Sequence, residues 1–384
     1  MFRFQCSISR GGVEMATSIS SAQTKTMVQD LQQLIQKYHS HRPFLVCGHS
    51  FMTTHSYQEL LMMKDVIITT FHDYEPNPKY ESVVKGLAAF YRNNSDLLIS
   101  IGGGSPMDVA KSIKAFYNMK PDIPFVNQPI FANPIVHIAI PTTAGTGSEV
   151  THFAVIYYQG KKYSISDESL LPEAYVLAPS LLDSLPLYQR QASMLDALCH
   201  AIESIWALKA TCQSQTDAQR ALMEWIDNYR SYLAGDVKAN GPMLEAANLA
   251  GRAINISTTT AAHAMAYKLT SLYGIAHGHA VALCLPKIWR YMMVHLDQVQ
   301  KGIDAQTVSR RFEMITQALG QKDVTAAIEW FEALTTSLEL TVPTIQSKEQ
   351  LEDLTNSVNL QRLRNNPIKL DRLAIKEIYL DILQ

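Results

Sequence analysis

The sequence has few cysteines, and they follow no pattern. The five are scattered, odd in number and include no CxxC pair: Cys6, Cys47, Cys199, Cys212 and Cys284. This argues against a disulfide framework and against a thiolate zinc site, and it fits a reducing compartment. We therefore expect a cytoplasmic protein.

Long apolar runs and blocks of like charge are also missing. No stretch of about 18 apolar residues occurs, and the first residues, Met-Phe-Arg-Phe-Gln-Cys-Ser, lack the apolar core of a signal peptide. The formal net charge is -2, and acidic and basic residues are interspersed. The sequence thus predicts no membrane partner, no nucleic-acid partner and a small-molecule substrate.

The 384 residues are enough for two domains, and the hydrophobic pattern changes near residue 183. Before it, near-continuous apolar runs at 43–47, 66–70, 97–101 and 135–140 alternate with helical patterns. Such runs are typical of strands buried on both faces of a parallel sheet. Residues 1–183 are therefore predicted to form a doubly wound, Rossmann-like α/β domain that binds its ligand at the carboxyl ends of the strands.

Residues 184–384 have helical spacing and few β-branched runs, which predicts an all-helical domain. Three prolines, Pro286, Pro343 and Pro367, are expected to mark breaks between helices.

The most informative residues lie in this second half. Asp196 and His200 are four apart in a segment with no Gly or Pro, so on a helix they point the same way. His263 and His277 come from a second segment and complete an Asp-His-His-His set. Each histidine alone is more often a hydrogen-bonded core residue, but together the four predict a metal site. Their oxygen and nitrogen donors suit Fe(II), Zn(II) or a similar divalent ion.

Two glycine-containing loops follow predicted strands. The first, Ile-Gly-Gly-Gly-Ser-Pro-Met-Asp (101–108), runs into a helical pattern, where backbone N–H groups could receive a pyrophosphate. The second, Pro-Thr-Thr-Ala-Gly-Thr-Gly-Ser (141–148), is rich in hydroxyl groups that could donate to phosphate or ribose oxygens. Either loop alone could be a structural turn, but two after successive strands favour a dinucleotide.

Together, IGGGSPMDVAK, PTTAGTGSEV, LDALCHAIES and HAMAYKLTSLYGIAHGHA resemble the iron-containing (group III) alcohol dehydrogenases over nearly the whole chain. The resemblance implies the dehydroquinate synthase-like architecture, with an N-terminal Rossmann-like domain and a helical C-terminal domain. It implies metal ligands at Asp196, His200, His263 and His277. It also implies cofactor contacts at Gly103, Gly104, Ser105, Asp108, Thr142, Thr143, Thr146, Ser148, Asn77 and Lys162. Asp108 has an alternative role, which is to stabilise the first turn of its helix through the helix dipole.

The chain departs from the family pattern at two places. Many members have a proton-relay histidine where this chain has Tyr267, so Tyr267, the nearby His279 or a water molecule is expected to supply the proton. NAD-preferring members carry Asp at the end of the first strand, where this chain has Gly48, followed by His49 and Ser50. Without a carboxylate to repel a 2′-phosphate, NADP(H) is favoured over NAD(H).

The resemblance implies a metal-dependent, NAD(P)H-linked alcohol dehydrogenase or aldehyde reductase that uses Fe(II), or alternatively zinc, and forms a homodimer or higher oligomer. Within the family, the residues 151–157, the Lys-Lys-Tyr-Ser segment and Gly-Ile-Ala-His-Gly-His-Ala resemble phosphonoacetaldehyde reductases most. The alternatives are a dehydroquinate-synthase-like lyase and a non-catalytic metal-binding relative.

Overall fold

The computed structural model describes residues 17–20 and 26–383. Cys6 and the initial segment considered for a signal peptide lie outside the described residues. Contacts within the chain define two compact units. The first comprises Met1–Ile140 and Ser148–Leu177, and the second comprises Pro141–Gly147 and Ala178–Gln384. The second glycine loop thus groups with the helical unit, whereas the sequence suggests a single boundary at residue 183.

The first unit is built on a six-stranded sheet in the order β1-β8-β5-β4-β2-β3. Strand β2 pairs in parallel with β3 and β4, and β8 pairs in parallel with β1 and β5. Side chains of β2 and of most of β4 and β5 are buried, which explains their continuous apolar sequences. The strands are β1 (Thr17–Ser20), β2 (Pro43–Cys47), β3 (Thr69–Phe71), β4 (Leu97–Gly102), β5 (Val136–Pro141) and β8 (Ala174–Leu177).

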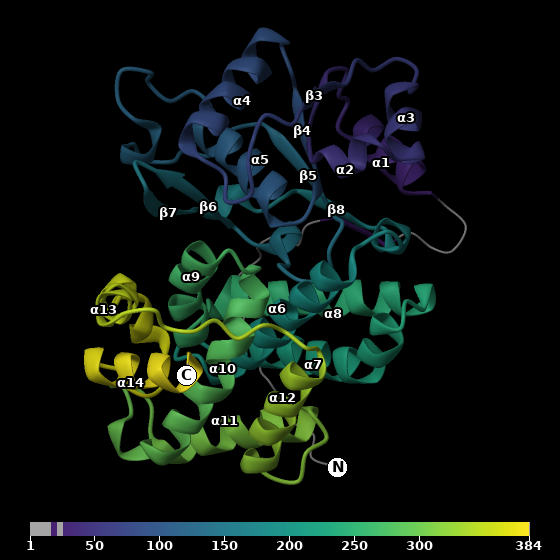
Figure 1. Ribbon diagram of the computed structural model, residues 1–384. Helices are drawn as coiled ribbons and strands as arrows, with labels where there is room; N and C mark the ends of the chain where they lie inside the picture. The colour runs from purple at the N-terminus through teal and green to yellow at the C-terminus, as the bar shows by residue number, and fades with distance from the viewer. Residues whose placement is uncertain (1–16, 21–25, 384) are drawn as a thin grey trace. The chain divides into compact units, whose positions relative to one another are not determined.

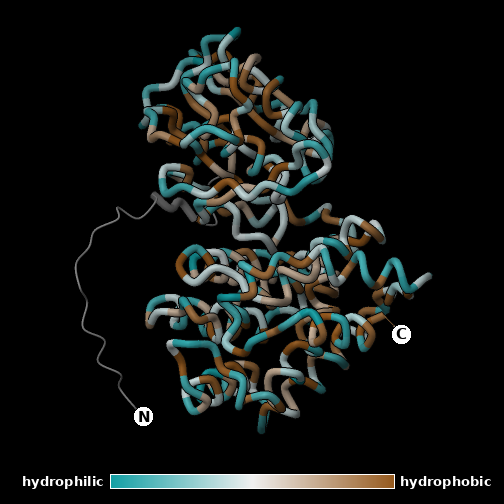
Figure 2. Tube along the Cα trace, turned by 90° about the vertical axis from the view of Figure 1, so that its left-hand side faces the viewer, coloured by the Kyte–Doolittle hydropathy of each residue, from teal (hydrophilic) through white to brown (hydrophobic). Residues whose placement is uncertain are grey.

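Helices connect these strands, and an antiparallel hairpin adds a second, smaller sheet (Figure 1). In Figure 2, brown apolar stretches run through the middle of this unit, and teal stretches lie mostly toward its outside. The helices are α1 (Met27–Lys37), α2 (His49–Met52), α3 (His55–Leu61), α4 (Tyr80–Arg92) and α5 (Gly104–Phe116), and the hairpin is β6 (Phe153–Tyr158) with β7 (Lys161–Ser166).

Three of the four strands expected from the sequence lie within one residue of the observed ones, but the run 66–70 does not. Here β3 covers only Thr69–Phe71, and Ile67 is 62% exposed. The strand lies at the edge of the sheet and has only β2 as a neighbour, so its pairing is short. Apolar residues in this run therefore did not indicate a strand buried on both faces.

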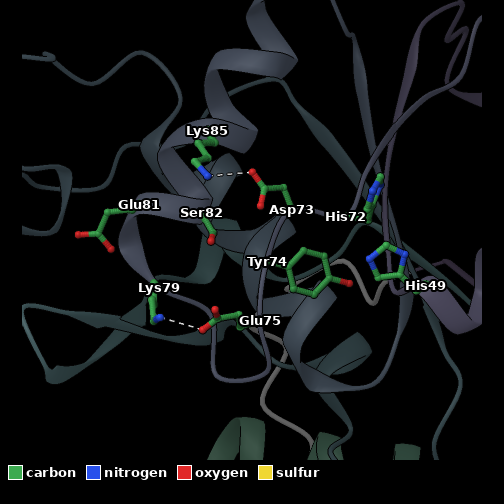
Figure 3. Close-up of a pocket in the computed structure, with 9 residues that line it drawn as sticks. All are labelled: His49, His72, Asp73, Tyr74, Glu75, Lys79, Glu81, Ser82 and Lys85. Atoms are coloured by element: carbon green, nitrogen blue, oxygen red, sulfur yellow. Dashed lines mark hydrogen bonds and ion pairs between the residues drawn. The ribbon is translucent and has the colours of Figure 1, made fainter.

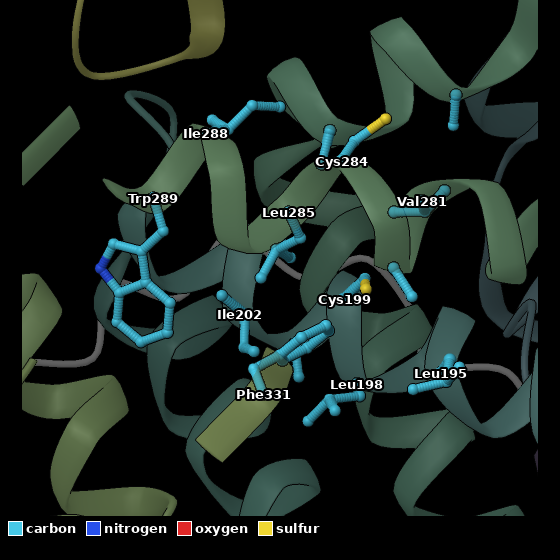
Figure 4. Close-up of a cluster of buried hydrophobic side chains, with 14 of the residues drawn as sticks. Leu195, Leu198, Cys199, Ile202, Val281, Cys284, Leu285, Ile288, Trp289 and Phe331 are labelled. Carbon is cyan, nitrogen blue, oxygen red and sulfur yellow. The ribbon is translucent and has the colours of Figure 1, made fainter. Parts of the chain in front are cut away.

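The second unit consists mainly of helices joined by turns and loops. They are α6 (Leu187–Trp206), α7 (Cys212–Leu233), α8 (Asn240–Ser257), α9 (Ala261–Tyr273), α10 (His277–Val294), α11 (Ala305–Ala318), α12 (Val324–Ser337), α13 (Lys348–Ser357) and α14 (Arg372–Ile382). Their core is centred on α6 and α10. Figure 4 shows Leu195, Leu198, Cys199 and Ile202 of α6 packed with Val281, Cys284, Leu285 and Trp289 of α10. These positions recur at helical spacing, so one face of each helix is buried against the other.

The expectation for Pro286 is wrong, because this proline lies inside α10 and not between helices. It is buried, and packing of α10 as a whole against α6, α9, α12 and α14 offsets the backbone hydrogen bond that the proline cannot donate. Pro343 and Pro367 do lie between helices, as expected.

Among the described residues, no helix is both long enough and apolar enough to cross a membrane. The four cysteines within the described ranges are free: Cys47, Cys199 and Cys284 are buried, and Cys212 is exposed. The reducing location expected from the cysteine pattern stays a prediction.

Candidate metal centre and cofactor-binding residues

The candidate metal centre forms where the start of α10 approaches the middle of α6. Gly278 makes this approach possible. A Cβ atom at this position would lie 2.0 Å from the carbonyl oxygen of Ala192 and 2.7 Å from Cβ of Asp196. Only glycine fits here, and the contact places His277 next to Asp196.

Three of the four predicted ligands converge. Asp196, His263 and His277 each offer a ligand atom within 4.8 Å of the other two. Asp196 and His263 are buried, and His277 is partly buried. Oδ1 of Asp196 and Nε2 of His263 are 3.4 Å apart, yet neither has a hydrogen-bond partner in the part of the chain that the structure describes. Buried polar atoms without partners are costly, and a metal ion would satisfy both.

Glu203 holds His263 in place, and the sequence analysis did not single it out. Its Oε2 bonds Nδ1 of His263, while its Oε1 accepts from the Thr260 hydroxyl at 2.6 Å and from the Ala262 backbone N–H at 2.9 Å. Burial works against the charged imidazole, but Glu203 and Asp196 raise the pKa of His263 to about 9. A metal ion would displace the proton from Nε2, and the hydrogen left on Nδ1 would donate to Glu203. The signal in the sequence is a glutamate seven residues after Asp196, a spacing that puts both carboxylates on the same face of a helix.

The charges of the cluster suit a divalent cation. Burial works against ionisation of Asp196, but the imidazoles of His200, His263 and His277 hold the pKa of its carboxyl well below the ordinary value. Burial also favours the neutral form of Glu203, but His263 and the hydrogen bonds from Thr260 and Ala262 lower its carboxyl pKa. Two ionised carboxylates in a buried site are complementary to an ion of charge +2.

His200 lies beside the cluster and not within it. Its Nε2 is 3.9 Å from Oδ1 of Asp196, and its ring stacks on that of His263 with centroids 4.4 Å apart. Burial lowers the pKa of His200 to about 4, which leaves the imidazole neutral and able to act as a ligand. The backbone of Gly145, in the second glycine loop, hydrogen-bonds this histidine.

The second glycine loop packs closely on the helical unit. Cβ atoms at Gly145 and Gly147 would collide with backbone atoms of Ser193 and Gly251, at 2.7 Å and 2.4 Å. Gly147 also has a φ of +59°. These glycines therefore allow the loop to pack closely on the helices. The predicted cofactor residues Thr142, Thr143 and Thr146 lie in the same loop, and thus in the same unit as the metal centre.

The two candidate proton donors differ in their surroundings. The Tyr267 ring stacks on that of His277, with centroids 4.9 Å apart. Burial raises the pKa of Tyr267, so the phenol keeps its proton at neutral pH. His279 is buried and pairs through Nδ1 with the Tyr188 hydroxyl at 3.1 Å. These contacts favour a packing role for His279 and leave Tyr267 next to a ligand.

In the first unit, the first glycine loop joins β4 to α5. Gly102 has a φ of +155°, and a Cβ atom there would lie 2.3 Å from Cγ of Pro106. Gly103 caps α5 without a side-chain hydrogen bond, and the helix begins at Gly104. The first backbone N–H groups of α5, which include that of Ser105, are therefore placed to receive an anion.

A group of charged residues follows this loop. It consists of Asp108 and Lys111 of α5 and Lys162 of β7. The Lys111 ammonium donates to the carbonyl and hydroxyl oxygens of Ser148 at 2.6 and 3.0 Å, and to Thr151 Oγ1 at 3.1 Å. Burial raises the pKa of Asp108 to about 7, an effect that Lys111 and Lys162 oppose. No acidic residue lies in the first turn of α5, so the helix-dipole role considered for Asp108 is not supported.

The segment Gly48–Ser50 follows β2, and His72 follows β3, so parallel pairing brings both to one edge of the sheet. The rings of His49 and His72 are 4.7 Å apart and line a hollow of about 540 Å³ together with Tyr74, Ser82 and Lys85 (Figure 3). A Cβ atom at Gly48 would meet only Ser50 Oγ and the Tyr74 hydroxyl, both at 3.9 Å. Asn77 lies in the exposed turn before α4 with a φ of +57°, a value that asparagine tolerates.

The chain combines a parallel α/β unit, in which a glycine loop leads into a helix, with a helical unit that gathers one carboxylate and several imidazoles. This combination defines the class of protein. Residues 21–179 match the family description "Iron-containing alcohol dehydrogenase", and residues 191–383 match its C-terminal domain. The chain belongs to the iron-containing alcohol dehydrogenase family. This confirms the resemblance and the fold class inferred from the sequence.

Several relatives have been named for their activities. Phosphonoacetaldehyde reductase of Streptomyces viridochromogenes is 32% identical over 296 residues, which are 73% of this chain and 74% of that protein. Aldehyde-alcohol dehydrogenase 2 of Entamoeba histolytica is 36% identical over 242 residues, which are 59% of this chain but only 28% of that longer protein. The solved structure of sulfoacetaldehyde reductase from Bifidobacterium kashiwanohense in complex with NAD+ is 25% identical, with a TM-score of 0.84 and 96% of each chain covered.

Proposed function

We propose that the protein is a metal-dependent, NAD(P)H-linked alcohol dehydrogenase that works as a reductase of small aldehydes. The convergence of Asp196, His263 and His277 on one point carries this proposal, because Glu203 fixes the histidine tautomer that a metal requires. Family membership and the names of the relatives support it. Fe(II) is the proposed ion, and His200 is the proposed fourth ligand.

When bound, a divalent ion would polarise the carbonyl group and the nicotinamide would supply hydride. Asp196 provides negative charge, and Glu203 keeps the Nε2 lone pair of His263 directed at the ion site. The protonated phenol of Tyr267, stacked on His277, is the proposed proton source for the product oxygen. The proposed cofactor-binding residues are Gly103, Gly104, Ser105, Asp108, Asn77, Ser148 and Lys162 of the first unit and Thr142, Thr143 and Thr146 of the second.

The proposal is tested by measuring NADPH and NADH oxidation with a panel of aldehydes, after metal analysis of the purified protein. The panel contains phosphonoacetaldehyde, sulfoacetaldehyde and propanal. Steady, metal-dependent consumption of the reduced cofactor with at least one aldehyde is expected. A dehydroquinate-synthase-like lyase would recycle its cofactor without net consumption, and a non-catalytic relative would bind metal without turnover.

Replacing Glu203 should weaken metal binding. Glu203→Gln keeps the shape of the side chain but removes the negative charge beside His263, so metal affinity and kcat/KM should each fall about 10- to 100-fold. Metal affinity is measured by competition with a chelator. Glu332→Gln is the control, because Glu332 of the same unit pairs with Lys287 and Arg290 and not with a predicted ligand. Equal metal affinity in wild type and Glu203→Gln would show that Glu203 does not tune the site.

We also propose that the enzyme prefers NADP(H), with Gly48, His49 and Ser50 near the adenosine ribose. The space around Gly48 admits a side chain, so Gly48→Asp should fold normally and repel a 2′-phosphate. The ratio of kcat/KM for NADPH to that for NADH should fall by about 10- to 100-fold. The matched control is Gly48→Asn, which has nearly the same shape and no charge. A ratio that is the same in both variants would place the adenosine ribose elsewhere.

The proposed assembly is a homodimer or higher homo-oligomer, as the resemblance implies. Analytical ultracentrifugation of the purified protein measures it directly, and a monomer at assay concentrations would refute it.

A further inference from the structure

Arg362 is a charged residue close to the metal centre that the proposed chemistry does not use. It begins the short 3₁₀ helix Arg362–Asn365 and is only partly exposed. Its Cζ atom lies 5.1 Å from the centroid of the Tyr267 ring. None of the ion pairs among residues 17–20 and 26–383 involves this guanidinium. A half-buried cation without a carboxylate partner is unusual, since burial of a charge is costly.

Tyr267 places this cation near the predicted metal ligands. The Tyr267 ring, which contacts Arg362, also stacks on the His277 imidazole, with centroids 4.9 Å apart and planes 12° from parallel. The Arg362–Tyr267 and Tyr267–His277 distances together set an upper limit on the distance between Arg362 and the His277 ring, so the guanidinium lies near this predicted ligand. A hydrogen bond between Arg362 and the Tyr267 side chain also opposes the rise in the pKa of the phenol. One such bond leaves most of the five guanidinium N–H donors for another acceptor.

The segment that bears Arg362 is firmly anchored at its other end. Nδ2 of Asn365 donates to the carbonyl oxygens of Ser257 and Thr259 at 2.8 and 3.0 Å, and to the Thr258 hydroxyl at 2.9 Å. Thr258 has a φ of 55° and a ψ of 172°, a conformation that is strained for a β-branched residue. Strain that is held by several hydrogen bonds is typical of positions where a ligand must be placed accurately.

We propose that Arg362 is the receptor for an anionic group on the substrate, and that it selects aldehydes bearing a phosphonate, sulfonate or carboxylate close to the carbonyl. The inference rests on the proposed function and assigns a specificity-determining residue to it. A guanidinium presents two parallel N–H donors that match the oxygens of such a group. Contact with the Tyr267 ring and the hydrogen bond to its side chain restrict the position of the guanidinium, which would place the bound anion at a defined distance from the reacting carbon.

The test compares an anionic and a neutral aldehyde of similar size. In Arg362→Gln, kcat/KM for phosphonoacetaldehyde should fall on the order of 30-fold more than kcat/KM for propanal, mainly through KM. Arg362→Lys keeps the charge but loses the planar fork, so it should lie between wild type and Arg362→Gln. Arg364→Gln is the matched control, because Arg364 is exposed and belongs to the same short helix. Sulfoacetaldehyde and a carboxylate aldehyde then show which anion is preferred.

Binding of methylphosphonate, measured by calorimetry, gives a readout that needs no turnover. It should be at least tenfold weaker in Arg362→Gln than in wild type or Arg364→Gln. Equal losses on phosphonoacetaldehyde and propanal, with unchanged methylphosphonate binding, would overturn the assignment and leave Arg362 as a support for Tyr267. If wild type reduces no aldehyde, the proposed function fails, and the calorimetry alone then decides whether Arg362 is an anion receptor.

Discussion

The His263→Ala variant is expected to lose both its metal and its turnover. His263 supplies one of three convergent ligand atoms, and without it the remaining ligands, with His200 as the proposed addition, would bind a divalent ion weakly. The expected fall in kcat/KM is at least ~1,000-fold, which corresponds to about 4 kcal/mol of transition-state stabilisation. The measurements are metal content after dialysis and initial rates with the aldehyde panel.

Loss of His263 also leaves Glu203 buried without its main partner, so part of the effect could come from lower stability. Asp196→Asn separates the two causes, because it removes a ligand charge without opening a cavity. His295→Ala controls for the loss of a histidine, since that ring stacks on Tyr291 and bonds its carbonyl oxygen within the same unit. Full turnover without bound metal in either site variant would refute the mechanism.

Much of the fold could be predicted from hydrophobic patterns. Strands β2, β4 and β5 are central and buried, so their sequences are continuously apolar and their limits were found nearly to the residue. Edge strand β3 and hairpin β6–β7 have mixed exposure, and their sequences lack this signal. The grouping of the second glycine loop with the helical unit depends on backbone contacts at Gly145 and Gly147, which no local pattern reveals.

The candidate site could be predicted only where chemistry and spacing coincide. Asp196 and His200 share a helix face, but only the fold shows that His263 and His277 reach the same place. Glu203 has helical spacing from Asp196, but only its contact with His263, 60 residues away in the chain, shows its role. Arg362 contacts Tyr267, 95 residues away, so short-range spacing could not reveal it. His279 was considered for proton transfer on proximity in sequence, yet on helix α10 its ring turns to Tyr188.

Gly278→Ala is the second change with a large expected effect, although it adds only one methyl group. The new Cβ would lie 2.0 Å from the Ala192 carbonyl oxygen and 2.9 Å from the Asp196 backbone nitrogen. Backbone atoms cannot rotate away, so the start of α10 must move from α6 and carry His277 with it. Displacement of a ligand by about 1 Å can cost about 100-fold in rate, and overpacking costs about 1–3 kcal/mol of folding free energy. We expect losses of these sizes in kcat/KM and in unfolding free energy, together with weaker metal binding.

Gly241→Ala is the matched control for this change. Gly241 also lies in a helix of the second unit, but there the nearest atom to a new Cβ would be Pro179 Cγ at an ordinary 3.5 Å. Replacement should be neutral or slightly stabilising, because alanine loses less conformational entropy than glycine in a helix. A second change, Ala192→Gly, should not rescue Gly278→Ala, since the collision is with a carbonyl oxygen and not with the alanine methyl group. Rescue, or metal affinity equal to wild type in Gly278→Ala, would show that the metal centre does not depend on this close helix contact.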